Sequence, residues 1–149
     1  MPVSEVCNRE VVIVKRDTTV NEAAILMRQH HVGNVVVVEE RNGIRIPVGI
    51  VTDRDLVVEI MAPELAQMTI TVGEIMAPKL ATVRGNTGVF EAIQYMRDEG
   101  VRRLPVVNGN GMLLGILTLD DLLELLAEEL LGLSRLINQE QKKESKNRP

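Results

Sequence analysis

Short runs of β-branched residues separate amphipathic segments along the first half of the chain. Val11–Val14 and Val35–Val38 are uninterrupted apolar runs, which is typical of strands that are buried on both faces. Pro47–Val51 is a third such run, and the Asn42-Gly43 pair before it predicts a turn. Between the first two runs, apolar residues recur at helical spacing. The buried face of that predicted helix consists of Val20, Ala23, Ala24 and Met27.

Polar residues indicate where the helices begin. Thr19 and Glu22 have the spacing of a capping box, in which each side chain accepts a hydrogen bond from the backbone N–H of the other residue. Thr52 holds the same kind of position before a predicted helix over Asp53–Met61, which Pro63 stops. The first half of the chain therefore reads strand, helix, strand, strand, helix.

The second half of the chain repeats this order. Val3–Val38 aligns on Val72–Val107 without a gap, and Gly49–Leu56 then aligns on Gly115–Leu122 after three extra residues in the first copy. An internal duplication predicts two related units, so a site in one copy predicts a twin in the other. The second copy's elements are strands over Ala81–Val83, Leu104–Val107 and Leu113–Leu117, a helix over Val89–Glu99 that Gly100 terminates, and a hairpin turn over Asn108–Gly111.

The last predicted helix is longer than its counterpart in the first copy, because it runs from Leu119 to about Ile137. Two interpretations of its leucines stay open: they pack on the chain's own core, or they pair with a partner helix in an oligomer. The segment Gln139–Pro149 is polar and mixed in charge, and we expect it to be frayed or disordered. The leucine stripe consists of Leu122, Leu126, Leu130, Leu133 and Ile137.

These patterns divide the chain into five segments. We assign residues 1–62 to the first repeat, 63–71 to a linker, 72–125 to the second repeat, 126–138 to an extension of the last helix and 139–149 to a polar tail.

Composition excludes several classes of function. A net charge of −4 and a total of one Phe, one Tyr and no Trp argue against nucleic-acid binding, since neither a basic surface nor stacking residues are available. No apolar stretch is long enough to span a membrane. Cys7 is the single cysteine, which fits the reducing cytoplasm. Together with the adjacent His30-His31 pair it makes a poor metal-binding set, so we predict no metal.

The pattern Thr-x-x-Asp occurs at the same strand-to-helix junction in both copies, as Thr52–Asp55 and Thr118–Asp121. A threonine followed by an acid three residues later is a capping box, and that structural role is sufficient to explain either copy. The same geometry also suits a ligand. Backbone N–H groups and a threonine hydroxyl can contact a phosphate, while an aspartate can accept hydrogen bonds from the two hydroxyls of a ribose. The two roles are compatible.

The combination of these motifs resembles a tandem pair of CBS domains, the module named after cystathionine β-synthase. The resemblance rests on Gly49–Leu56, Gly115–Leu122, Val101–Val107 and the phrase Val72–Met76 with Thr82-Val83, and it covers roughly residues 1–125. The first copy departs from the pattern at Val36, which stands where the second copy has Pro105. The resemblance implies an α/β (α+β) fold of two βαββα repeats that pack about a pseudo-twofold axis, here with a long C-terminal helix.

The resemblance also implies ligands and partners. CBS pairs commonly bind AMP, ADP, ATP or S-adenosylmethionine in clefts between the repeats, and commonly form homodimers. Ribose would be held by Asp55 and Asp121, and phosphate by Thr52, Thr118 and arginines such as Arg54. Arg102 and Arg103 are the other arginines expected to contact phosphate, and Asp120 is expected near it. The residues expected to flank the base are Ile13, Val14, Val35, Val36, Thr82, Val83, Leu104 and Pro105.

The two sites implied by the resemblance are not equivalent. The second copy has Arg102-Arg103 but also Asp120, an acid beside any phosphate, whereas the first has Arg54 and the neutral pair Gly33-Asn34. Arg102 and Arg103 have a second interpretation, as a solvated surface pair. We expect a non-catalytic sensor that binds an adenosine-containing ligand and acts on an effector protein that the sequence does not identify. The alternative is a ligand-free interaction module that assembles through the CBS pair and the leucine-rich helix.

Overall fold

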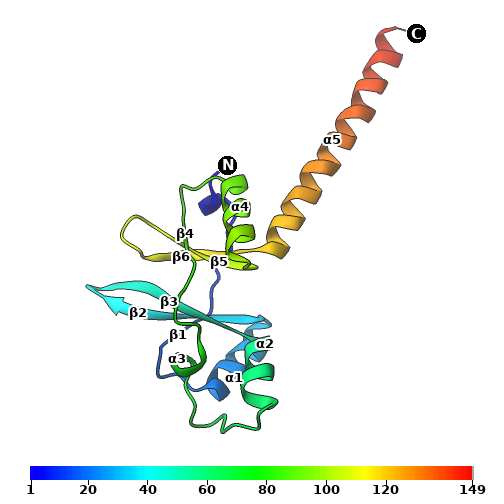
Figure 1. Cartoon of the computed structure of the whole chain (residues 1–149). Helices are drawn as coiled ribbons and strands as arrows, with labels where there is room; N and C mark the ends of the chain where they lie inside the picture. Colours follow the sequence, from blue (N-terminus) through cyan, green and yellow to red (C-terminus); the bar gives the residue numbers. More distant parts are fainter. Residues whose placement is uncertain (149) are drawn as a thin grey trace. The chain divides into compact units, whose positions relative to one another are not determined.

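The computed structural model describes residues 1–148 and divides the chain into two compact units, Met1–Leu117 and Thr118–Pro149. The expected α/β class is confirmed, because the chain combines two three-stranded sheets with helices and ends in a long helix (Figure 1). Among the described residues, no helix combines the length and hydropathy needed to cross a lipid bilayer.

The first sheet contains β1 (Ile13–Val14), β2 (Asn34–Arg41) and β3 (Ile44–Thr52) in that spatial order. β1 runs parallel to β2, and β2 pairs with β3 in antiparallel register from Asn34 opposite Thr52 to Arg41 opposite Ile44. The predicted turn at Asn42-Gly43 joins β2 to β3 with both residues at positive φ, at 53° and 79°. Both strands of this hairpin extend beyond the apolar runs that predicted them.

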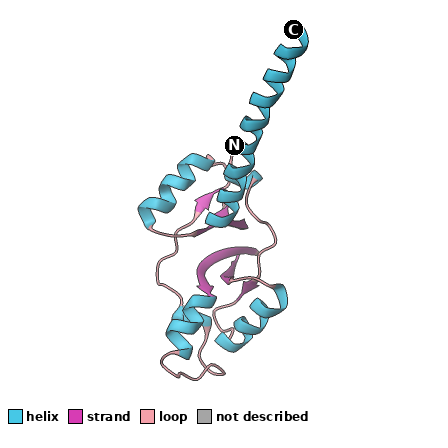
Figure 2. Ribbon diagram, turned by 90° about the vertical axis from the view of Figure 1, so that its right-hand side faces the viewer, coloured by secondary structure: helices cyan, strands magenta, loops and turns pink. Residues whose placement is uncertain are grey.

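The second sheet repeats the order with β4 (Val83–Arg84), β5 (Arg103–Val107) and β6 (Leu113–Thr118). β4 is parallel to β5, as β1 is to β2. The helices of the first unit lie on the outer sides of the two sheets (Figure 2). They are η1 (Val3–Glu5), α1 (Val20–His30), α2 (Asp53–Leu56), which continues as a π-helical turn over Val57–Met61, α3 (Val72–Ile75) and α4 (Val89–Glu99).

Local sequence explains how these helices begin and end. The reciprocal hydrogen bonds of the predicted capping box are present at α1, from Glu22 N to Thr19 Oγ1 (3.1 Å) and from Thr19 N to Glu22 Oε2 (3.3 Å). Gly100 ends α4 in the left-handed conformation at φ 66°, as predicted. The predicted buried face of α1 is wrong at Ala24, which is exposed, because Leu26 packs partly against the core instead.

Alternate residues of each strand pack on opposite sides of the sheet. In β2, Val35 and Val37 pack with the helix residues Val20 and Met27, while Val36 and Val38 pack with Ile116 of β6. The second contact joins the two sheets face to face. An aliphatic core of this kind is what a chain with only two aromatic residues has to build.

Each repeat packs its first segment on the other repeat. Val3 N donates to Thr87 O (2.8 Å), and Asn8 and Ile116 exchange two backbone hydrogen bonds of 2.9 Å. In the same way Val72 N donates to Thr18 O (2.8 Å). The segment before β1 therefore belongs structurally to the second repeat, and α3 belongs to the first. The segment boundaries at residues 62 and 72 stay a prediction. They differ from the grouping that the packing gives, in which each first segment belongs with the other repeat.

The second unit consists of α5 (Leu119–Asn147). The prediction of a frayed segment over 139–149 is wrong as far as Asn147, because glutamine, glutamate and lysine are good helix formers and continue the helix. Pro149 lies outside the described residues.

Candidate functional site

The candidate site of the first repeat begins with a capping box at the start of α2. Asp55 N donates to Thr52 Oγ1 (3.1 Å), and Thr52 N donates to Asp55 Oδ2 (2.8 Å). The structural role of Thr-x-x-Asp is thereby confirmed in this copy. The cap uses one carboxylate oxygen of Asp55 and only the acceptor capacity of the Thr52 hydroxyl. Asp55 Oδ1 and the hydroxyl proton therefore remain for a ligand, and both side chains are half-buried.

The start of β2 lies beside this cap. Asn34 is the register partner of Thr52, and Asp53 N donates to Gly33 O (2.9 Å). Asp53 is exposed and its Oδ1 accepts from Arg54 N (2.8 Å), which fixes the carboxylate at the mouth of the helix. The backbone of Gly33 therefore forms one wall of the candidate site.

An arginine from the second repeat reaches the same wall. A β-carbon built on Gly33 would lie 3.7 Å from Arg103 Nη2 and 3.3 Å from Asp53 Oδ2. Glycine keeps this space open, since a side chain would force the carboxylate to shift. The structure places Arg103 beside the first copy's Thr-x-x-Asp, whereas its place in the sequence groups it with the second copy. Because the sheets pack face to face, the start of β5 lies next to the start of β2, and Arg103 adjoins the Thr52–Asp55 cap.

The apolar residues expected to flank a base are distributed over two environments. Val35, Val36, Leu104 and Pro105 are fully buried, so their side chains form core rather than open surface. Val35 packs on the helix side of the sheet, and only Val36 of that pair faces the other repeat. The strand alternation explains this split, which the continuous valine run conceals. The partly exposed members of the expected set are Ile13 and Thr82, whereas Val14 and Val83 are buried.

The counterpart of this cap in the second repeat is at the start of α5. Thr118 Oγ1 accepts from Asp121 N (3.1 Å), and the described structure has the reciprocal bond at Thr52 but not at Thr118. Asp120 is exposed in the first turn, as Asp53 is in the first copy. Arg54 and Arg102 are also exposed.

Two cavities that the sequence analysis missed occupy equivalent places in the two repeats. One lies at the end of β1, beside Val38–Glu40 of β2, and the other at the ends of β4 and β5. The first, of about 540 Å³, is lined by Ile13–Asp17, Val38–Glu40 and Arg45. The second, of about 730 Å³, has Arg84–Asn86 and Val107–Gly109 in its wall with Met1, Pro2 and Ser4. The signal that predicts such a place is a polar or glycine-containing turn directly after each parallel strand.

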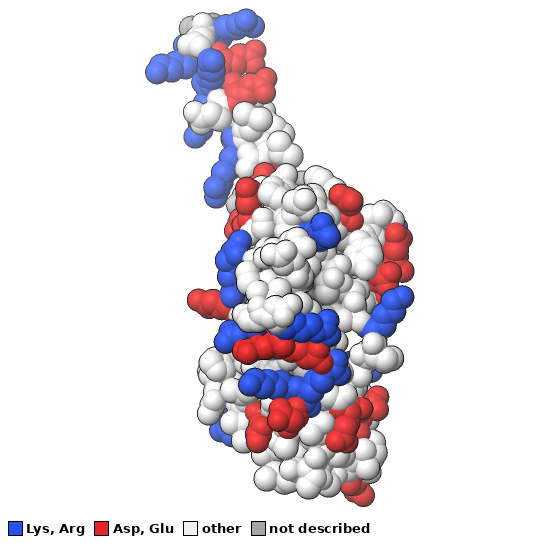
Figure 3. All heavy atoms as spheres, turned by 90° about the vertical axis from the view of Figure 1, so that its left-hand side faces the viewer, with Lys and Arg blue, Asp and Glu red and all other residues white. Residues whose placement is uncertain are grey.

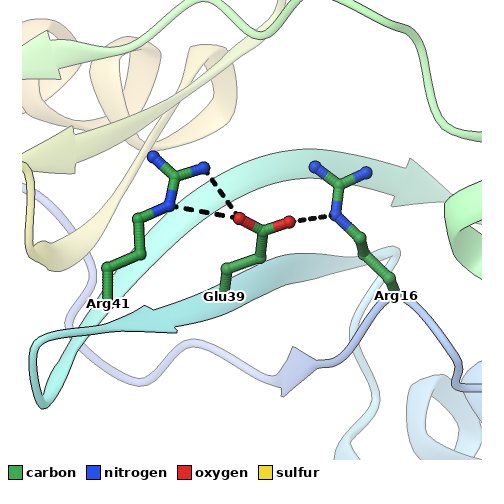
Figure 4. A network of polar contacts seen from close by, with 3 residues as sticks. All are labelled: Arg16, Glu39 and Arg41. Carbon is green, nitrogen blue, oxygen red and sulfur yellow. Dashed lines mark hydrogen bonds and ion pairs between the residues drawn. The ribbon is translucent and has the colours of Figure 1, made fainter.

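Charge distinguishes these cavities. In the smaller one Glu39 lies between Arg16 and Arg41, accepting from Arg41 Nη2 (2.7 Å) and from Arg16 Nε (Figure 4). The hydrogen bonds from Arg41 and then Arg16 lower the pKa of Glu39. Positive and negative side chains are likewise interleaved over the first unit in Figure 3.

The chain was compared with known proteins. The family model described as CBS domain matches residues 3–62 and 72–128. An uncharacterized protein of Methanopyrus kandleri, MK0525, is 38% identical over 122 residues, which are 82% of this chain and 61% of that protein. The chain therefore spans about three fifths of that relative.

Two solved structures show the same fold. The Pyrobaculum aerophilum CBS domain protein PAE2072 complexed with AMP has a TM-score of 0.72 at 29% identity, covering 81% of this chain and 89% of its own. Hypoxic Response Protein I with two coordinated zinc ions has a TM-score of 0.71 at 29% identity, covering 83% and 98%. In the described part of the present chain, no group of three or more His, Cys, Asp or Glu residues is placed to hold a metal ion. With both repeats matched by the family model, the chain belongs to the CBS domain family.

Proposed function

We propose that the chain is a non-catalytic regulatory module that binds an adenosine-containing ligand beside the Thr52–Asp55 cap. The observation that carries the proposal is the meeting of Asp53 and of Arg103 from the other repeat at Gly33, next to the Thr52–Asp55 cap, whose Thr52 is the register partner of Asn34. A ligand held there would contact both repeats, so its binding would depend on how they pack.

Each feature has a chemical role toward such a ligand. Asp55 Oδ1 would accept hydrogen bonds from the ribose hydroxyls, in the way that a carboxylate recognises a vicinal diol. Arg103 would bind the phosphate, since a guanidinium makes charge-assisted, bidentate bonds with phosphate oxygens. Backbone groups near Ile13 or near Thr82, its equivalent in the other repeat, would contact the base, because these are the partly exposed members of the set expected to flank it.

Charge favours a ligand with few phosphates. Asp53 Oδ2 lies against Gly33 on the same side as Arg103, so each added phosphate would meet this carboxylate as well as the guanidinium. The AMP bound to the related PAE2072 is a ligand of that kind. AMP is therefore our first choice, ahead of ADP, ATP and S-adenosylmethionine. A cytoplasmic location and a homodimer of CBS pairs remain part of the proposal.

Isothermal titration calorimetry with AMP, ATP and S-adenosylmethionine tests the proposal. Asp55→Asn keeps an acceptor for the Thr52 cap but removes the charge, and Arg103→Gln removes the guanidinium. We expect each change to weaken AMP binding at least tenfold, about 1.4 kcal/mol or more. Glu22→Gln, in the capping box of α1, and Arg28→Gln, at the exposed end of α1, are matched controls that should leave affinity within twofold. Absence of heat with all three ligands on the wild-type chain would overturn the proposal.

The alternative, an interaction module without a ligand, is favoured by a different observation. Several leucines of α5 are exposed, which is unusual for side chains that make no contact with a partner. The same titration separates the two functions, because a module of this kind would bind none of the three ligands and would still self-associate.

A further inference from the structure

A continuous apolar seam runs along α5. Leu119, Leu123, Leu126, Leu130, Leu133 and Ile137 follow one another at alternating spacings of four and three. This is the repeat by which two helices pack side by side with interlocking side chains. The seam covers about 27 Å of helix at 1.5 Å per residue. It ends after Ile137, where Glu140 and Glu144 take the next two positions.

Most of the seam is open to solvent. Leu123, Leu130, Leu133 and Ile137 are between 56 and 67% exposed, and Leu122, beside the seam, is the buried residue of the described helix. Leu136 on the seam's flank is 60% exposed. Side chains in this position bury little apolar surface against their own helix, so the seam has the composition of a surface that packs against a partner.

The charges along α5 are divided between its ends. Residues 119–131 carry acids and no Lys or Arg, namely Asp120, Asp121, Glu124, Glu128 and Glu129. Residues 132–148 carry more bases than acids, with Arg135, Lys142, Lys143, Lys146 and Arg148 against Glu140 and Glu144. A second copy laid antiparallel brings the basic end of each helix to the acidic end of the other. A parallel copy would bring the two acidic ends together, which is unfavourable.

We propose that α5 pairs with α5 of a second copy in an antiparallel arrangement. The register that we propose sets Leu130 opposite the partner's Leu133 and Leu126 opposite the partner's Ile137, so it pairs the four residues of the seam nearest its C-terminal end. In that register Lys142 and Lys143 lie level along the helix axis with the partner's Asp121 and Asp120, so the basic end of each helix lies alongside the acidic end of the other. The pairing also gives the polar stretch beyond Ile137 a role, because it carries the bases to the partner's acidic end. This inference does not depend on a nucleotide.

Disulfide trapping tests direction and register. In a Cys7→Ser background, single cysteines are placed at Leu126→Cys and Ile137→Cys. Mild oxidation of the mixed variants should give a covalent dimer that contains one of each. Either variant alone should give at least tenfold less, because its cysteines lie near opposite ends of the paired seam. Efficient trapping of Leu126→Cys alone would show a parallel pair and overturn the proposal.

Light scattering tests whether the seam holds copies together. The double variant Leu130→Glu/Leu133→Glu should halve the particle mass at micromolar concentration, whereas Ser134→Glu/Asn138→Glu, off the seam, should keep the wild-type mass. Circular dichroism confirms that each variant is folded. An unchanged mass for the seam variant, or a wild-type chain that is monomeric, would overturn the proposal, and neither result would affect the calorimetric test of nucleotide binding.

Discussion

Gly49 and Gly115 are equivalent positions in the two repeats, yet the structure predicts that alanine is tolerated at one and not at the other. A β-carbon at Gly115 would lie 2.6 Å from the backbone oxygen of Asn8 and 2.8 Å from Cys7 Sγ. At Gly49 the nearest atoms all belong to the Met76 side chain, and its Sδ, which is the nearest, moves away when the flexible methionine changes rotamer. The difference arises because η1 and α3, the exchanged segments, contact the two sheets through different atoms.

The cost at Gly115 follows from what has to move. Relieving the overlap displaces Asn8 and breaks the two backbone hydrogen bonds that it exchanges with Ile116. Each such bond contributes about 1 kcal/mol, and η1 would also draw the fully buried Val3 toward solvent. We expect Gly115→Ala to lower the free energy of unfolding by about 2 to 4 kcal/mol and the Tm by roughly 5 to 12 °C. Gly49→Ala should cost about 1 kcal/mol or less.

Urea denaturation followed by circular dichroism measures both variants at once. Gly132→Ala is the control, because nothing lies within 4 Å of the added carbon and the helix should gain about 0.5 to 1 kcal/mol. Equal losses for Gly49→Ala and Gly115→Ala, or a larger loss at Gly49, would refute the reasoning from the exchanged segments.

Two further predictions concern pH and the surface. Burial raises the pKa of the Cys7 thiol above its usual value, despite the nearby Arg9, so its rate of alkylation should rise at higher pH than that of a free cysteine. The contribution of this thiol to the free energy of unfolding is present below the pKa that Cys7 has in the unfolded chain, and it is lost as the pH rises through the folded-state pKa. A Cys7→Ser variant should not show this loss. If the alkylation rate of Cys7 had the same pH midpoint as that of a free thiol, the raised pKa would be contradicted. Arg41 and Arg16 lower the pKa of Glu39. The contribution of Glu39 to the stability of the fold is therefore present above the pKa that Glu39 has in the unfolded chain, and it is lost as the pH falls through the folded-state pKa. Carboxyl NMR titration of the wild type and Arg41→Gln measures the shift, and an unchanged Glu39 midpoint in the variant would refute the assignment.

Features whose cause is local were predictable from the sequence. The helix over Val89–Glu99 is confirmed at both ends, because Gly100 supplies a left-handed terminator within one residue of the last turn. The capping boxes at Thr19 and Thr52 are confirmed for the same reason, since each depends on two side chains that are three positions apart. In these places the sequence pattern and the packing require the same residue.

Features whose cause lies far along the chain were not predictable. The repeat aligns Val3–Val38 on Val72–Val107, but nothing in that alignment says on which sheet the first segment packs. The position of Arg103 beside Asp53 has the same origin, since it depends on how the two sheets meet. The helix beyond Gln139 was missed for another reason. A polar composition argues against a buried core, but it does not argue against an exposed helix.

Because the two repeats exchange their first segments, the folded structure of each repeat depends on the other. Each repeat receives backbone hydrogen bonds from a segment that the sequence assigns to the other repeat, so neither half can be excised with its own packing intact. The same contacts would arise if two single-repeat chains swapped their leading segments to form a twofold dimer. The present chain has the connectivity of such a dimer after its two subunits have been fused. A single polypeptide therefore contains contacts of the kind that such a dimer forms between its subunits.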